Sequence, residues 1–245
     1  MFSWRPSASF ARSTNFVTVR VTDNGVPSLT SSRTFAVVVG DVLEVRLGTG
    51  IVLAGQTGSV PVIVFTSVPA TNATFTFEVP GTRLGTFTLD PPAAPLSSAT
   101  LQSLGGNRYR IRLGAASGQQ FAGEQTLSRL RFVAASGQAS AFVPLVVSDV
   151  SAFQTDGQPV PRALGSPGRV VYLGAEPLLE VLRDSGQVEL HLYARSAPGY
   201  TVESTLNLNP IVQWLPFWNG PVNNLLEVLP LSPTNQARFF RARRP

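Results

Sequence analysis

The sequence predicts an all-β protein made of β-sandwiches in tandem. Two observations support this: Val, Thr, Phe, Gly, Pro and Ser are abundant, and short apolar runs alternate with turn residues where helix formers would be needed for helices. A chain of 245 residues holds one large domain or two to three small ones. The strand pattern divides it into three units, residues 1–41, 42–175 and 176–245.

Composition excludes several function classes. Without Cys there is neither a disulfide frame nor a thiolate metal site. All 19 basic residues are Arg, but the net charge of +5 is modest and no basic block typical of nucleic-acid binding occurs, so we expect no nucleic-acid partner. No apolar stretch is long enough to cross a bilayer, so no transmembrane segment is predicted.

Residues 15–40 have the pattern of a β-hairpin. Val17, Val19 and Val21 alternate with polar or bulky residues, residues 23–28 form a turn, and residues 34–39 form the return strand. A lone hairpin is marginally stable, and residues 1–14 are too few and too polar to cover it. We therefore expect residues 1–41 to be the end of a domain whose earlier strands, and an export signal, lie upstream.

The segment Val19-Arg20-Val21-Thr22-Asp23-Asn24-Gly25-Val26-Pro27 resembles the end of a cadherin-like repeat. In that family the Asp binds calcium, a role that carries over to Asp23 alone. The family's linker of oxygen ligands is replaced by residues 41–45, Asp-Val-Leu-Glu-Val. Calcium prefers six to eight oxygens. We therefore expect Asp23 to cap the turn, with calcium as the alternative.

Residues 42–173 contain the strands of a complete two-sheet sandwich or jelly roll. Turn clusters separate them, such as Gly105-Gly106-Asn107. The expected strands are 42–47, 58–65, 74–79, 86–89, 108–113, 127–133, 141–147 and 169–172.

This unit resembles the cohesin-type module, a relative of carbohydrate-binding domains. The resemblance lies in the entry turn at residues 55–62, the strand containing Tyr109, Ile111 and Leu113, the run at residues 130–133, and a late loop from Asp149 to Gly157. It implies a jelly-roll sandwich that docks a protein or carbohydrate partner. It also implies a secreted or cell-surface modular protein of the adhesion type.

The third unit is expected to be a small β-sandwich. Its strands are predicted at residues 187–193, 199–204 and 237–242, with Trp214 in the core. The Tyr-x-Val-x-Ser strand at residues 200–204, the later Trp and the final Phe-Phe-Arg at residues 239–241 resemble a C-terminal module of large bacterial surface proteins. That resemblance implies location more than activity.

Counting side chains argues against catalysis. His191 is the only His, and its strand pattern, with Leu190 and Leu192 on the other face, predicts an ordinary surface position. A carboxylate pair is the remaining route to hydrolysis, but nothing in the sequence places aromatic platforms beside such a pair. We predict no enzyme. The carboxylates considered are Asp149, Asp156, Glu176, Glu180 and Asp184.

Alternation in two strands predicts an Arg-rich surface. Three Arg are expected to point outward from residues 108–113 and two from residues 127–133, and they would share one sheet face if the strands are neighbours. The family resemblance makes one outer sheet face the partner-binding surface. The other interpretation is a solvated face in an Arg-biased sequence, with the Arg stems covering neighbouring aliphatics. The candidate partner-binding residues are Arg108, Arg110, Arg112, Arg129 and Arg131.

Trp218, beside Asn-Gly in the third unit, is a weaker candidate for stacking on a sugar ring. Two functions remain open. The first is a non-catalytic, extracellular binding module that docks a protein or polysaccharide. The second is a structural spacer followed by a C-terminal sorting or capping unit.

Overall fold

A computed structural model of the protein describes residues 4, 8–184, 186–209, 212–231 and 238–244. Nearly all of its regular structure is β-strand, and the strands form several sheets, which confirms the predicted all-β class. Within these residues the helical structure is η1 (Ala8–Phe10), and no helix is long and apolar enough to span a bilayer.

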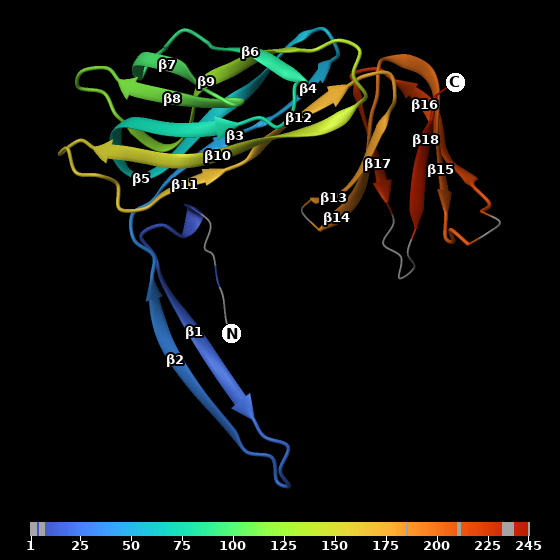
Figure 1. Ribbon diagram of the computed structural model, residues 1–245. Helices are drawn as coiled ribbons and strands as arrows, with labels where there is room; N and C mark the ends of the chain where they lie inside the picture. Colours follow the sequence, from blue (N-terminus) through green and yellow to red (C-terminus); the bar gives the residue numbers. More distant parts are fainter. Residues whose placement is uncertain (1–3, 5–7, 185, 210–211, 232–237, 245) are drawn as a thin grey trace.

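The N-terminal hairpin consists of β1 (Thr14–Thr22) and β2 (Thr30–Val38), paired antiparallel along their full length. It extends away from the rest of the chain (Figure 1). Among the described residues no other strand pairs with it, and Phe16, Val21, Phe35 and Val38 are exposed. The predicted hairpin is thus present. The upstream strands expected to cover it stay a prediction.

The central unit is a sandwich built around one long strand. That strand, β5, spans Thr57–Glu78 and passes through both sheets. It replaces the two separate strands expected at residues 58–65 and 74–79. The other strands are β3 (Leu43–Leu47), β4 (Thr49–Leu53), β6 (Leu84–Leu89), β7 (Leu96–Gly105), β8 (Arg108–Ala115), β9 (Phe121–Ala134), β10 (Ala141–Gln154), β11 (Ala163–Ser166) and β12 (Gly168–Leu173).

The two halves of β5 belong to opposite layers. Residues 72–78 lie between β8 and β10, and β7 pairs with the far side of β8; we call this layer the front sheet. Residues 57–66 pair with β9, and residues 62–66 also pair with β3 on the other side. With β6 beside β9 and β11 beside β3, these strands form the layer that we call the back sheet. The first half of β10 pairs instead with β12, which pairs with β4.

Large side chains from both sheets meet between them. Phe77 stacks on Tyr109 of the front sheet at 5.2 Å between ring centroids and meets Phe87 of the back sheet edge-on at 5.5 Å. Phe75, Ile111 and other core residues are completely buried. This alternation of buried and outward side chains is what aims the polar residues of each strand at solvent.

Two further expectations for this unit were wrong. The late loop expected at residues 149–157 is largely strand, because β10 continues to Gln154 opposite β5. Strands β4, β7 and β11 were missed: β7 is rich in Ser and Thr with few apolar residues, and β4 and β11 are only five and four residues long.

The C-terminal unit has two three-stranded sheets, β13-β14-β17 and β16-β15-β18 (Figure 1). Leu190, Leu192, Tyr200 and Val202 form its buried core, which matches the expected small sandwich. Of the predicted strand at residues 237–242, Ala237 lies outside the described residues. The strands are β13 (Leu178–Asp184), β14 (Gln187–Tyr193), β15 (Ala197–Thr205), β16 (Leu215–Val222), β17 (Leu226–Leu231) and β18 (Phe239–Arg243).

Candidate functional site

The outer surface of the front sheet, here called the front face, carries three of the five predicted Arg. Arg108, Arg110 and Arg112 alternate along β8 with the core residues Ile111 and Leu113, so they point away from the core. The register across the sheet gives the remaining members. They are Ser98, Thr100 and Gln102 on β7, Asn72, Thr74 and Glu78 on β5, and Val146, Ser148, Ser151 and Phe153 on β10. Thr76 of β5 is on the same side of the sheet but is only 1% exposed, so it is not part of the accessible face.

The three guanidinium groups of the front face differ in their partners. Arg108 stands opposite Glu78 and its Nη2 lies 3.5 Å from Asp149 Oδ2. Arg112 Nη1 donates to Gln102 Oε1 at 3.3 Å. Within the described residues no carboxylate lies within 4.0 Å of Arg110 or Arg112. Two positive charges on this face are therefore not neutralised locally.

A β-bulge on β10 supplies the acidic partner of Arg108. The register between β10 and β5 shifts between Ser148 and Ser151, and Asp149 there has a φ of 51°. The Ser148 hydroxyl donates to Asp149 Oδ2 at 3.3 Å. On the same strand Val146 and Phe153 are 47% and 46% exposed, so the polar face has apolar contact area at its β10 margin.

The five Arg would share one surface only if β8 and β9 were neighbours, and the structure does not meet this condition. β8 and β9 are not neighbours, because each pairs with a different half of β5. Arg129 and Arg131 point outward from the back sheet, opposite Pro61 and Ser59. Asp90 binds the Arg131 side chain, and this hydrogen bond raises the pKa of Arg131. The bend of β5 between the two layers could not be seen in either strand alone.

The two C-terminal tryptophans are both half-buried, which differs from the expected exposed Trp218 and core Trp214. Trp218, expected to be exposed, packs against the unit's core, and its ring covers Gly220: a Cβ there would lie 2.5 Å from Trp218 Cζ2. A register shift between β15 and β16 makes Phe217 the extra residue, so both Phe217 and Trp218 face inward. Trp214, expected in the core, lies under the Arg241 guanidinium, 4.3 Å from its ring centroid.

Asp23 caps the hairpin turn, as expected. Its Oδ1 accepts hydrogen bonds from the Gly25 and Leu29 amides at 3.1 and 2.8 Å, and these bonds lower the pKa of Asp23. Asp41 instead lies at the base of the hairpin, 3.6 Å from Arg12. In the described part of the chain, no group of three or more His, Asp or Glu side chains could hold a metal ion. Calcium binding stays an untested prediction.

The candidate catalytic carboxylates have structural partners. Asp156 accepts a hydrogen bond from the Gln158 amide at 2.9 Å, and Glu176 accepts one from the Ser140 amide at 3.3 Å. Asp149 pairs with Arg108, as described above, and Glu180 pairs with Arg169. The Asp184 side chain lies outside the described residues. These partners give each described carboxylate a role in the fold.

His191 belongs to a polar cluster where the C-terminal unit meets the sandwich, and not to an open surface as predicted. Its side chain is 15% exposed and its Nε2 lies 2.9 Å from Glu189 Oε2. Its Nδ1 lies 3.4 Å from the Tyr193 hydroxyl. It is half-buried because its strand, β14, is central in its sheet, between β13 and β17.

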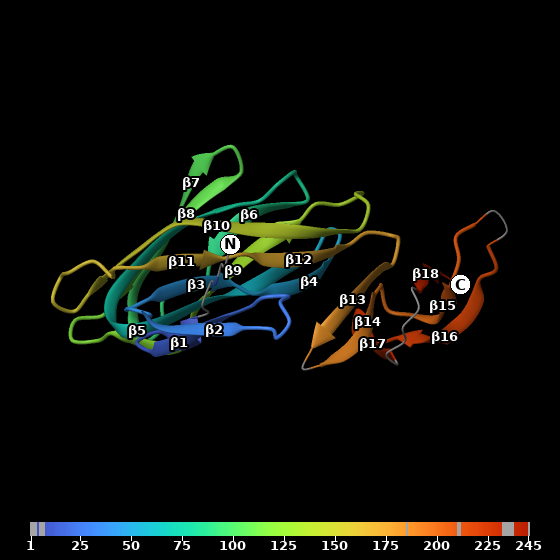
Figure 2. The same cartoon turned by 90° about the horizontal axis from the view of Figure 1, so that it is seen from below.

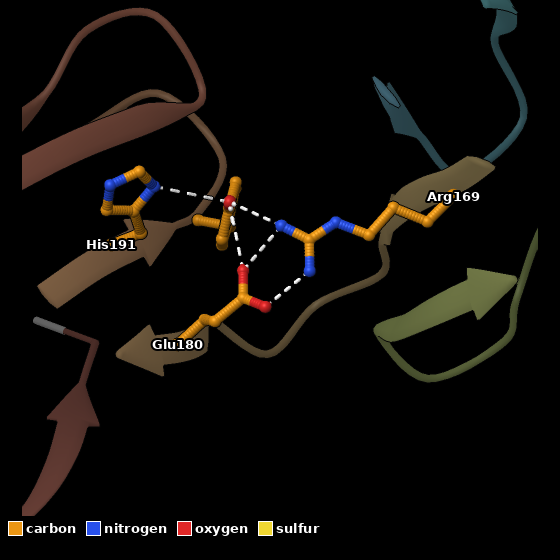
Figure 3. Close-up of polar contacts among 4 residues, drawn as sticks. Arg169, Glu180 and His191 are labelled. Atoms are coloured by element: carbon orange, nitrogen blue, oxygen red, sulfur yellow. Dashed lines mark hydrogen bonds and ion pairs between the residues drawn. The ribbon is translucent and has the colours of Figure 1, made fainter. Parts of the chain in front are cut away.

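The centre of that cluster is a bidentate ion pair (Figure 3). Arg169 of β12 donates through Nη1 to Glu180 Oε1 and through Nη2 to Oε2 at 2.6 Å. The Tyr193 hydroxyl donates to Glu180 Oε2 at 3.3 Å, and the Arg169 guanidinium lies 5.3 Å from the Phe142 ring centroid. Hydrogen bonds from Arg169 lower the pKa of Glu180, while burial raises the pKa of Tyr193.

Beside the ion pair, apolar side chains of both units pack together. Val171 and Leu173 on β12 are fully buried against Tyr193, while Val170 and Tyr172 face the sandwich core. β12 is thus covered on both sides, which explains its continuous apolar run. The sequence analysis did not predict this junction. The signal that could have indicated it is the apolar run of β12, because a strand exposed on one side would alternate apolar and polar residues.

Comparison with known proteins gives fold neighbours. No family model matches the chain, and no curated protein does. The seventh ScaB type I cohesin of Pseudobacteroides cellulosolvens is similar at 18% identity, covering 56% of this chain and 95% of the cohesin, with a TM-score of 0.45. A non-cellulosomal cohesin of Archaeoglobus fulgidus is similar at 15% identity, 54% and 91% coverage and a TM-score of 0.44.

A type I cohesin–dockerin complex from Clostridium thermocellum is similar at 11% identity, 54% and 94% coverage and a TM-score of 0.47. Identities this low describe fold and not ligand. The cadherin-like and C-terminal resemblances have no counterpart among these structures. These solved structures contain cohesin modules, jelly-roll β-sandwiches that match about half of this chain, and the cohesin-type module is the resemblance that the sequence predicted.

Proposed function

We propose that the protein is a non-catalytic docking module of a larger extracellular or cell-surface protein, and that its front face binds an acidic protein partner. The observation that carries this proposal is the pair Arg110 and Arg112, two outward cations with no carboxylate within 4.0 Å among the described residues. Unneutralised Arg on an open face attracts acidic surfaces and forms bidentate contacts with carboxylates.

The remainder of the front face suits a protein partner. Around the buried Thr76, short Thr, Ser and Asn side chains on β5, β7 and β10 offer hydrogen-bonding groups to a partner. Val146 and Phe153 add exposed apolar area along one margin. Protein interfaces combine such apolar area with Arg and a polar rim. On the back face, Arg131 already has Asp90 as its partner, and only Arg129 has no carboxylate within 4.0 Å among the described residues.

The two faces provide a matched test. The full chain is immobilised and loaded with secreted and envelope proteins and glycans of the source organism, and bound material is eluted along a salt gradient. The variant Arg110→Ser/Arg112→Ser removes two front-face charges. The control variant Arg129→Ser/Arg131→Ser removes the same charge from the back face.

We expect a protein that elutes at moderate salt, is retained by the wild type and by the back-face control, and is lost from the front-face variant. Equal retention by both variants would contradict the assignment to the front face. Salt-sensitive retention of a glycan alone would replace the protein partner with an anionic polysaccharide.

A structural spacer is the second candidate function, and the junction favours it. The Arg169–Glu180 pair and the apolar contacts around Tyr193 connect the sandwich to the C-terminal unit over a short linker. A spacer needs such a fixed joint, because flexible linkers transmit no orientation. Small-angle scattering of wild type and Glu180→Gln would show one fixed envelope for the first and a broader distribution of dimensions for the second.

A further inference from the structure

The free edge of β7 borders the front face. β7 pairs with β8 along one side, and in the described part of the chain no strand pairs with its other side. It lies at the margin of the sandwich in Figure 2. Residues 98–103 stay in continuous register with residues 109–114, so this stretch is a regular edge six residues long. Its outward backbone N–H and C=O groups are available to another strand.

β7 lacks the features that normally block edge pairing. Its sequence, LSSATLQSLG, contains no charged residue and no Pro. Proteins usually protect exposed edges with charges, Pro or bulges. The neighbouring edge strand β6 shows such protection: its register with β9 shifts between Gly85 and Thr88, and Thr86 has a φ of 50°. In β7 the irregularities lie at the two ends only, between Leu96 and Ser98 and between Ser103 and Gly105.

The front-face cations extend toward this edge. Arg112 stands opposite Thr100 in the register, yet its guanidinium reaches Gln102 on β7 at 3.3 Å. The guanidinium of Arg112 therefore contacts a side chain of β7, the edge strand. A strand added to β7 would run about 4.8 Å further out. Carboxylates on alternate residues of that strand would point to the front face and lie within reach of Arg110 and Arg112.

We propose that the β7 edge accepts an extended acidic segment of the partner as an additional strand, whose alternate carboxylates pair with Arg110 and Arg112. This proposal rests on the proposed function and specifies how the partner engages the front face. A peptide fits because the edge offers only backbone groups, which another peptide backbone complements along its length. The sign of the charge follows from the two unneutralised guanidinium groups.

The probe is the peptide Ac-(Glu-Thr)5-NH2, added to the full chain and followed by hydrogen exchange with mass spectrometry. We expect slower exchange at residues 96–105, because the outward amides of β7 become hydrogen-bonded. Arg110→Ser/Arg112→Ser should weaken peptide binding by about tenfold, the effect of losing two solvent-exposed ion pairs. The back-face control Arg129→Ser/Arg131→Ser should bind as the wild type does. The peptide Ac-(Lys-Thr)5-NH2 should not bind.

Two results would overturn this inference. Binding of the acidic peptide without slower exchange in β7 would mean that charge alone holds it, which refutes strand addition and leaves the front face as the docking surface. Equal binding of the acidic and basic peptides would remove the role of the two Arg. The capture experiment tests the proposed function separately. If the front-face variant retains the natural partner, the proposed function itself is wrong.

Discussion

Replacing Glu180 with Gln tests whether the ion pair at the junction holds the C-terminal unit to the sandwich. The substitution preserves the size of the side chain but removes its charge. Arg169 then faces an amide that can accept only one of its two hydrogen bonds. The guanidinium would keep its contact with the Phe142 ring but lose its counter-charge.

The degree of burial of the ion pair determines how much unfolding free energy the substitution should cost. The side chains of Arg169 and Glu180 are 29% and 19% exposed, so neither is fully solvated nor fully buried. Exposed ion pairs contribute about 0.2–1 kcal/mol. Removing one partner of a fully buried pair costs about 3–5 kcal/mol. We therefore expect a loss of about 2 kcal/mol in the unfolding free energy of the C-terminal unit.

Tryptophan fluorescence can isolate that unit. The three Trp are Trp4, Trp214 and Trp218, and the sandwich contains none. In a Trp4→Phe background, fluorescence reports the C-terminal unit while far-ultraviolet circular dichroism reports the whole chain. With an m-value of about 1 kcal/mol/M for a unit this small, the urea midpoint of the fluorescence transition should fall by roughly 2 M.

A double-mutant cycle provides the refutation. Arg169→Leu and Glu180→Leu are measured singly and together. If the two side chains stabilise each other, the double variant loses less than the sum of the single losses, since no unpaired charge is left. Additive losses, or a fluorescence midpoint that Glu180→Gln does not change, would show that the apolar contacts alone hold the junction.

Two further predictions concern pH and packing. Because Arg169 lowers the pKa of Glu180 below its ordinary value of 4.5, the contribution of the pair is complete above that pH and is lost as the pH falls further. The fluorescence midpoint should therefore drop on acidification in wild type and less in Glu180→Gln; equal drops would contradict this. Gly168→Ala should destabilise the sandwich by about 1–3 kcal/mol, because its Cβ would lie 2.3 Å from the Leu47 carbonyl oxygen. Gly85→Ala is the control, because no atom lies within 4 Å of its Cβ. Urea midpoints measured by circular dichroism should fall for Gly168→Ala but not for Gly85→Ala, and equal midpoints would contradict this prediction.

Local pattern was sufficient for much of the fold. The alternation of Tyr109, Ile111 and Leu113 with three Arg correctly gave β8 and its inner and outer sides. The Asp-Asn-Gly sequence correctly gave the hairpin turn and the capping role of Asp23. Such features depend on residues adjacent in the chain, so they can be read from the sequence.

The structure decided which surfaces those residues share. Arg110 and Arg131 have the same local pattern but lie on opposite sheets, because β5 continues from one layer into the other. A single extra residue in β16 turned Trp218 inward. The ion pair between Arg169 and Glu180 joins strands of two units, and the residue pattern within either strand does not predict it.

The sequence by itself determined the all-β class, the order of most strands and the outward direction of the Arg side chains. Tertiary structure alone decided that three of the Arg lie on the front face, that β7 borders this face with an edge unpaired in the described part of the chain, and that His191 is half-buried. The physical reason is that side-chain direction within a strand follows from local geometry, whereas the partner of each strand depends on contacts between residues far apart in the chain.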